Sequence, residues 1–170
     1  MAVIDNVART FAPLTGTEED VAWGMLAFYR STLLMKCQGL EDSQLRFRSV
    51  GPSKMTLLGL LRHMTEVERY WFQEVILGDK VVPYYGQDSE ADFDNLDSTP
   101  VPEVVRRFHI ACADSHTVAV DRSLDQDVPC EMFGKPVSIR FIAIHMVEEY
   151  ARHCGHADLL REALDGSTGL

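Results

Sequence analysis

Side chains that could bind a metal are concentrated in one short stretch of this chain. Between His145 and His156 the sequence places three histidines and two glutamates within twelve residues, with no proline and one glycine. On a helix, at ~100° per residue, positions 145, 149, 153 and 156 share one face. Side chains three or four positions apart then lie ~5–6 Å from each other at Cβ. Imidazole and carboxylate groups at that spacing can converge on one ion, so the stretch indicates a metal site on a helix.

Spacing alone does not choose the ligands within this stretch. Three pairs at i,i+3 or i,i+4 are admissible, namely His145 with Glu149, Glu149 with His153, and His153 with His156. The competing interpretation is a solvated face on which Glu148 and Glu149 pair with Arg152 and His153. Arg152 shares the histidine face, where it could orient Glu149 or bind an anionic substrate, although structural pairing is its more common use.

A second helix has to contribute, because one helix face cannot surround an ion. His63 lies among Leu60, Leu61, Met64 and Val67 in a segment of helical apolar spacing. A lone histidine in such a setting is usually a core residue, but the Glu/His cluster elsewhere makes His63 a candidate third ligand. Three protein ligands leave coordination positions for water or substrate, which distinguishes a catalytic metal site from a structural one.

Long amphipathic helices are predicted to position these groups. Apolar residues at helical spacing, with capping residues at the ends, predict helices over about residues 17–39, 53–77, 102–124 and 138–164. Four helices of this length predict an all-α four-helix bundle. We expect a single domain over residues 1–170, with its core in residues 17–166.

Two of the connections between these helices are long. Residues 79–99 hold six acidic side chains and are expected to form an exposed loop, whose aromatic start could fold over one end of the bundle. Residues 125–137 contain two prolines and a glycine and are compatible with a short hairpin.

Composition and charge exclude several classes of partner. The formal net charge is −10 and the 16 basic residues are scattered, so the chain lacks the clustered Lys and Arg that bind nucleic acid or anionic membranes. No run of ~18 apolar residues predicts a transmembrane helix, and the N-terminal segment does not resemble a secretory signal. We therefore expect a cytoplasmic protein, with its four cysteines reduced and no ligand role for Cys154.

Two longer motifs resemble the DinB/YfiT-like superfamily of metal-binding four-helix bundles. They are Leu57–Phe72, which surrounds His63, and Ser138–Gly166, which contains the Glu/His stretch. The second motif is long and specific. It resembles the actinobacterial branch of mycothiol-dependent enzymes, of the S-transferase and maleylpyruvate isomerase types. The resemblance covers residues 17–166 and implies helices in an up-down-down-up order, with long connections.

The resemblance also implies a ligand set for one divalent metal, with His63 on the second helix and Glu149 and His153 on the fourth. Many members carry histidine where this chain has Glu149, but a His-Glu-His set resembles that of the maleylpyruvate isomerase type. Zinc suits such a mixed nitrogen and oxygen set, although nickel, iron and manganese fit it too. No catalytic residue beyond these three ligands is implied.

Four neighbouring residues belong to the same stretch without an assigned part in metal binding. His145, Arg152 and His156 are expected to orient a ligand or to contact substrate, and His156 could do so by a hydrogen bond to a ligand. Asp158 belongs to the branch signature, and its role does not follow from the sequence.

The expected activity is transfer of a low-molecular-weight thiol of the mycothiol class to a small electrophile. A divalent cation, two neutral imidazoles and one carboxylate leave a net charge of about +1, which favours ionisation of an incoming thiol. Metal-activated water would instead support hydrolysis, and a non-enzymatic metal- or ligand-binding stress protein is a third possibility. The same three ligands serve every alternative, so the ligand set does not decide the reaction.

Each helix of a bundle buries one apolar face in the core, the core stripe. Apolar residues outside this predicted core stripe indicate a homodimer. Ile144, Met146 and Val147 lie beyond the face that holds Glu149, and the first helix is apolar most of the way round. A helix of that kind needs a second partner to cover it, and two-fold dimers are the commonest closed assembly. The competing interpretation is that the arm of residues 1–16 and the connection 79–99 cover this surface within one chain.

Overall fold

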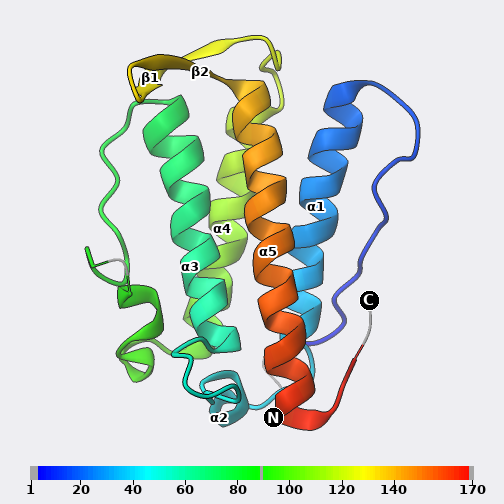
Figure 1. Cartoon of the computed structure of the whole chain (residues 1–170), viewed down its shortest axis with the longest axis vertical. Helices are drawn as coiled ribbons and strands as arrows, with labels where there is room; N and C mark the ends of the chain where they lie inside the picture. Colours follow the sequence, from blue (N-terminus) through cyan, green and yellow to red (C-terminus); the bar gives the residue numbers. More distant parts are fainter. Residues whose placement is uncertain (1–3, 89, 169–170) are drawn as a thin grey trace.

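The main elements of the computed structural model are four long helices that lie side by side (Figure 1). The model describes residues 4–88 and 90–168, so residues 1–3 of the predicted arm, Ser89 of the long connection and residues 169–170 lie outside the described part. The long helices are α1 (Glu18–Cys37), α3 (Leu57–Arg69), α4 (Val101–Ala119) and α5 (Ile139–Asp165). The chain is mostly helical, as the sequence predicts.

Shorter elements join these helices. The helix α2 (Asp42–Leu45) follows α1, and a π-helical segment (Tyr70–Ile76) continues α3. Two 3-10 helices, Ala91–Phe93 and Leu96–Ser98, lie in the connection to α4. The strands β1 (Asp127–Met132) and β2 (Lys135–Ser138) pair antiparallel before α5 and form a small two-stranded sheet.

The direction of the helices explains why the connection between α3 and α4, residues 79–99, is long. In Figure 1, α1 and α5 run away from the hairpin end of the molecule, whereas α3 and α4 both run towards it. Because α3 and α4 are consecutive and point the same way, the chain between them has to return along the whole length of the helices. In Figure 1 this connection passes down the outside of α3. It therefore lies beside α3 and does not close over one end of the helices.

Side-chain caps set the starts of the helices. Thr17 accepts a hydrogen bond from the backbone N–H of Asp20 at the start of α1, and Ser138 caps α5 in the same way. The second long helix begins at Leu57 and not at Ser53, because Thr56 is the residue that caps it, through the N–H of Gly59 at 2.9 Å. Ser53 instead accepts from the N–H of Met55 within a preceding turn.

The third long helix ends at Ala119, earlier than the predicted end near residue 124. The segment that follows is tied to the start of α5 by two backbone hydrogen bonds, from Ile139 N–H to Gln126 O and from Arg140 N–H to Leu124 O, each at 2.9 Å. Leu124 is buried there, with 1% of its surface exposed. Pairing with α5 thus replaces the last predicted turn of the helix.

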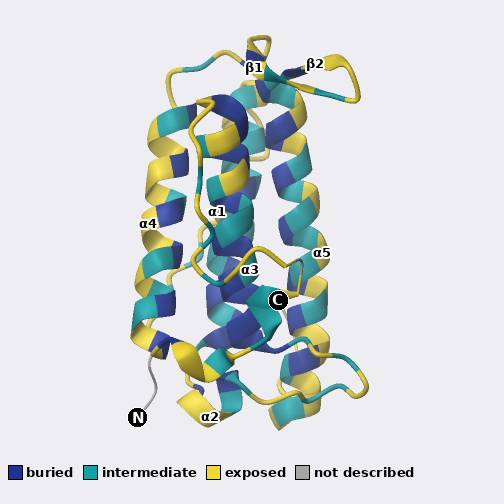
Figure 2. Ribbon diagram, turned by 90° about the vertical axis from the view of Figure 1, so that its left-hand side faces the viewer, coloured by how far each residue is buried: buried dark blue, intermediate teal, exposed yellow. Residues whose placement is uncertain are grey.

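The apolar core lies between the four long helices. Figure 2 shows buried residues on their inner faces and exposed residues on their outer faces. The large side chains with less than 2% exposure include Leu33, Leu60, Met64, Phe72 and Phe108. Met146, which the sequence placed outside the core stripe, is fully buried as well. Among the described residues, no helix combines the length and the apolar character that a membrane crossing requires.

A polar cluster joins all four long helices inside this core. Arg30 of α1 donates from Nε and Nη2 to the two carboxylate oxygens of Glu68 of α3, at 2.7 and 2.6 Å. The hydroxyl of Tyr150 on α5 donates to Glu68 Oε1 at 2.7 Å, and the Cys112 thiol of α4 lies 3.9 Å from the same oxygen. Glu68 and Tyr150 are both completely buried. Because burial disfavours the charged form, the pKa of Tyr150 is raised well above its ordinary value.

Candidate metal centre

Three side chains from two helices come together on the α3/α5 side of the molecule. His63 of α3 meets Glu149 and His153 of α5, and their potential ligand atoms all lie within 4.8 Å of one another. The His63 and His153 ring centroids are 4.7 Å apart, and His153 Nε2 is 3.5 Å from Glu149 Oε2. Ligand atoms at ~2.0–2.2 Å from one ion lie ~3–4 Å apart, so small side-chain rotations would bring these atoms onto a common ion.

The helices hold the three side chains at the edge of the core. His63 follows the buried Leu60 and precedes the buried Met64, so its own side chain emerges beside the core, with 25% of it exposed. Glu149 and His153 are one turn apart on α5, with 17% and 12% of their side chains exposed. The site is therefore partly shielded from water and still accessible from one side. Of the three pairs that spacing left open, the structure combines Glu149 and His153 with His63.

His153 is in the form that can bind a metal. Burial, followed by the positive charge that His63, His156 or Arg152 carries when protonated, lowers the pKa of His153 from 6.5 to about 4. Its ring is therefore neutral near pH 7, as a nitrogen ligand must be. His153 Nδ1 is 3.3 Å from Nδ1 of His156, so one of these nitrogens donates a hydrogen bond to the other. His156 thus lies where it can orient the ring of His153.

His145 lies on the opposite side of Glu149 from His153. Its Nε2 is 3.5 Å from Glu149 Oε1 and its Nδ1 is 3.3 Å from Glu148 Oε2. Its ring stacks on Phe141, with centroids 5.7 Å apart and planes inclined by 6°, and its centroid is 4.7 Å from that of Trp71, with the planes inclined by 60°. His145 therefore contacts Glu149 directly, within a small aromatic cluster.

Arg152 and Asp158 make contacts away from the three converging side chains. Arg152 is 56% exposed and donates from Nη2 to Glu148 Oε1 at 3.1 Å, which is the pairing expected of a solvated helix face. Asp158 forms an ion pair with Lys36 of α1 at 2.6 Å and so links α5 to α1. Cys154 is buried beside the carbonyl of Tyr29, 3.6 Å from its sulfur.

One residue at this site was missed by the sequence analysis. Asp92, in the 3-10 helix Ala91–Phe93, places Oδ2 3.1 Å from Nδ1 of His63, and only 13% of its side chain is exposed. The expectation of an exposed acidic loop is wrong for this residue. The two residues are separated by 29 positions, and no local pattern connects them. Only the return of the connection along α3 brings Asp92 to His63.

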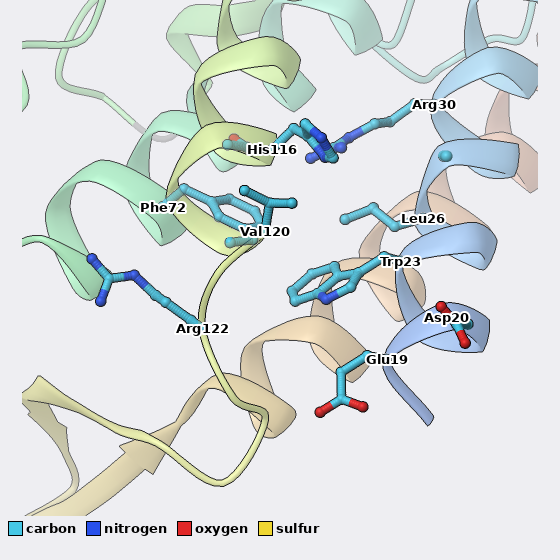
Figure 3. A pocket seen from close by; sticks show the side chains of 12 residues that line it. Glu19, Asp20, Trp23, Leu26, Arg30, Phe72, His116, Val120 and Arg122 are labelled. Atoms are coloured by element: carbon cyan, nitrogen blue, oxygen red, sulfur yellow. The ribbon is translucent and has the colours of Figure 1, made fainter. Parts of the chain in front are cut away.

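A cavity of about 380 Å³ lies between α1 and α4, away from these donors (Figure 3). Trp23 of α1 and Phe72 contribute its aromatic walls, with ring centroids 6.3 Å apart. Arg30 and His116 also line the cavity, and both are labelled in Figure 3. The Arg30 guanidinium already pairs with Glu68 in the polar cluster of the core. None of the three converging donors lines this cavity.

The chain matches one known family. Residues 22–166 match the family model described as Mycothiol-S-transferase. The matched range contains His63, Asp92, Glu149 and His153. No curated protein and no solved structure matches the chain.

Proposed function

We propose that this chain, which belongs to the mycothiol S-transferase family, binds a divalent metal through His63, Glu149 and His153 and transfers a low-molecular-weight thiol to a small electrophile. The observation that carries the proposal is the convergence of three metal-binding side chains from α3 and α5, with all their potential ligand atoms within 4.8 Å of one another. Within the described residues, this is the one group of three such donors.

The donor set fits a divalent transition metal with free coordination positions. Two imidazoles and one carboxylate are a common set for catalytic zinc, and nickel, iron or manganese also accept these donors. His156 Nδ1 beside His153 and Asp92 beside His63 supply the outer hydrogen bonds that metal-binding histidines usually have. We favour zinc, because its mixed nitrogen and oxygen sites need no further protein ligand for catalysis.

The reaction requires the thiol as its anion. When bound, a divalent cation lowers the pKa of a thiol that reaches it, so that the thiolate forms near neutral pH. The thiol proton passes to solvent, the sulfur forms a bond to the electrophilic carbon, and the leaving group departs with its electron pair. Glu149 limits the positive charge of the site to about +1 with two neutral imidazoles. Trp71 and Phe141 pack against the ring of His145, whose Nε2 lies 3.5 Å from Glu149 Oε1.

The finer description of the architecture is part of the proposal. We propose that the four long helices form an up-down-down-up four-helix bundle of the DinB-like type, as one domain over residues 1–170. We also propose a homodimer through the outer faces of α1 and α5. Ile144 and Phe141 of α5 are 59% and 49% exposed, and an apolar groove of about 430 Å³ runs beside Ile144, between Val21 and Met25 of α1 and Val147 of α5.

Elemental analysis and a thiol panel test the proposed function. Protein purified without a His-tag should contain a divalent transition metal near one equivalent, and His153→Ala should lose it. Arg152→Ala is the matched control, because Arg152 is the neighbouring residue and its guanidinium pairs with the exposed Glu148, which is not one of the three ligands. Metal-loaded protein is then incubated with a bimane electrophile and several low-molecular-weight thiols. We expect turnover that depends on thiol and disappears in His63→Ala.

Other outcomes of the same experiment would contradict the transferase. Turnover without any thiol would favour metal-dependent hydrolysis by the same three ligands. Metal binding without turnover across the panel would favour a non-enzymatic metal- or ligand-binding protein. Metal content near zero in the wild type, unchanged in His153→Ala, would contradict the metal centre itself.

A further inference from the structure

The hydrogen bond between His63 and Asp92 determines which nitrogen of His63 is free. A deprotonated carboxylate only accepts hydrogen bonds, so the nitrogen that faces Asp92 Oδ2 at 3.1 Å, Nδ1, carries the hydrogen. In a neutral imidazole the other nitrogen then presents its lone pair. Nε2 of His63 is therefore the nitrogen available to an ion. Without Asp92 the ring would distribute its hydrogen between both nitrogens.

Asp92 is held in place by the residue that precedes His63. Arg62 is buried, with 1% exposure, and donates from Nη2 to the carbonyl of Ala91 at 3.0 Å and from Nη1 to the carbonyl of Asp94 at 3.1 Å. These two carbonyls flank Asp92 along the chain. The guanidinium of Arg62 thus fixes the backbone on both sides of Asp92. The next residue of α3, His63, forms the hydrogen bond with the Asp92 carboxylate.

Phe93 adds a second fixed point. Its ring centroid is 5.8 Å from that of His63, and its ring lies against Gly59, one turn earlier on α3. A Cβ atom at Gly59 would come within 2.5 Å of Phe93 Cδ1, so only a glycine admits the ring at this place. The 3-10 helix Ala91–Phe93 is thus held on α3 at three successive residues, around a carboxylate directed at His63.

We propose that Asp92 is the positioning residue for His63, fixing its ring orientation and its Nδ1–H tautomer for metal binding. The inference rests on the proposed metal centre and extends it from the helices to the connection between α3 and α4. The competing explanation is that the contact merely attaches the connection to α3. A merely structural contact would affect the stability of the protein without changing its affinity for metal or the tautomer of His63.

Zinc affinity measured by competition with a chelator separates these explanations. Full-length, metal-free protein is titrated with Zn²⁺ as wild type, Asp92→Ala, Asp92→Asn and Asp94→Ala. Removal of an outer partner of a histidine ligand typically weakens metal binding ~10–100-fold, and we expect a loss of that size in Asp92→Ala. Asp92→Asn should retain more affinity, because its amide oxygen still accepts a hydrogen bond from Nδ1. Asp94→Ala removes a neighbouring carboxylate that lies near Arg48 and Lys54, and should bind zinc as the wild type does.

Two results of this titration would overturn the proposal. One is a wild-type affinity in Asp92→Ala while His63→Ala loses zinc, because Asp92 would then not act through His63. The other is an equal loss in Asp94→Ala, because the effect would then be one of general negative charge. Thermal unfolding of each metal-free variant shows whether the protein is folded before titration.

The tautomer of His63 gives a readout that needs no metal. Long-range ¹H–¹⁵N spectra of the histidine rings distinguish Nδ1–H from Nε2–H in the metal-free protein. We expect Nδ1–H for His63 in the wild type and a mixture with more Nε2–H in Asp92→Ala. An Nε2–H tautomer in the wild type would refute the proposal. If the wild type binds no zinc, the proposed function fails, yet this spectrum still decides whether Asp92 positions His63.

Discussion

Glu149 shares its two carboxylate oxygens between the histidines one turn before and one turn after it. Oε1 is 3.5 Å from Nε2 of His145, and Oε2 is 3.5 Å from Nε2 of His153. One oxygen therefore faces the converging donors, and the other faces His145, whose ring contacts Trp71 and Phe141. A carboxylate at this position can bind an ion through one oxygen while the second keeps a hydrogen-bond partner. A histidine in its place could also use one nitrogen for the ion and the other for a hydrogen bond, but it would leave the site without the negative charge of the carboxylate.

Cys37 illustrates how burial of a single thiol couples stability to pH. It is completely buried, and burial is the main reason why its pKa is raised from 9.0 to about 12. Because the folded-state pKa lies above the unfolded value, the protonated thiol contributes stability in full below pH 9. That contribution is lost as the pH rises from 9 towards 12, since only the unfolded chain releases the proton.

We therefore expect Cys37→Ala to be less sensitive to alkaline pH than the wild type. The contribution of Cys37 to the unfolding free energy should be about 1.4 kcal/mol smaller at pH 10 than at pH 8. Replacing the thiol creates a cavity whose cost does not depend on pH. The difference in urea unfolding free energy between wild type and variant, measured under reducing conditions, should thus shrink between pH 8 and pH 10. A constant difference over this range would contradict the prediction.

At the scale of the helices, the polar cluster of the core connects all four of them through Glu68. Its carboxylate accepts from Arg30 and Tyr150, and Glu68 and Tyr150 are completely buried, whereas 15% of the Arg30 side chain is exposed. Removing one member of a buried ion pair leaves an uncompensated charge, which costs about 3–5 kcal/mol. We expect that loss in the unfolding free energy of Glu68→Ala, measured with urea.

Tyr150→Phe serves as the control for this cluster. It removes one neutral donor from Glu68 and leaves the ion pair with Arg30 intact, so its cost should be only about 1–2 kcal/mol. Equal losses in the two variants would mean that the buried charge of Arg30 is not what makes Glu68→Ala unstable.

The contact between Gly59 and Phe93 makes α3 the support of the long connection. Gly59→Ala would normally favour a helix by roughly 1 kcal/mol, but here the added methyl group collides with the ring of Phe93. We expect the variant to release the segment around residues 91–93, and limited proteolysis should detect cleavage between α3 and α4. Phe93→Ala in the Gly59→Ala background removes the collision. If the double variant is cleaved as slowly as Phe93→Ala alone, the collision is the cause.

The sequence predicted the helices far better than the contacts between distant segments. Apolar spacing and capping residues are signals within a few positions of the chain, so most long helices begin and end within a few residues of the predicted bounds. The exceptions are the start of α3, which Thr56 caps, and the end of α4, beyond which Leu124 bonds to α5. Asp92 and Glu68 could not be found in this way. Their partners lie 29 and 38 positions away, and only the packing of whole helices brings them together.

The resemblance to a known family supplied what spacing left undecided at the site. Spacing offered three pairs on the last helix, and the residues that approach His63 are Glu149 and His153. The orientation of α5 relative to α3 selects them, because the neighbouring His145 faces Trp71 and Phe141. That orientation depends on the core as a whole and cannot be derived from the stretch alone.

At the scale of the whole molecule, the connection and the N-terminal arm cover different surfaces. The connection lies along α3, and the described part of the arm packs on α1, where Phe11 stacks on Phe28 with centroids 5.3 Å apart. Ile144 on α5 remains 59% exposed beside the apolar groove between α1 and α5. We expect this face to be covered by a second copy of the chain.

Light scattering of the wild type at micromolar concentration should therefore give a mass of twice the 19.2 kDa of one chain. Ile144→Asp places a charge on the apolar face and should give the monomer mass. Val82→Asp is the control, because Val82 is 69% exposed in the connection that lies beside α3, away from the outer faces of α1 and α5. A wild-type mass near 19.2 kDa would show that the face is not a dimer interface.

The π-helical segment Tyr70–Ile76 has a consequence for any comparison of this chain with a relative. A π-helical turn holds one residue more than an α-helical turn, and here it lets Trp71 face His145 of α5 while the adjacent Phe72 faces Trp23 of α1. A relative whose helix is regular throughout has one residue fewer at this place. A correct alignment must then open a one-residue gap within positions 70–76, since a gap placed before position 63 would set His63 against the wrong residue.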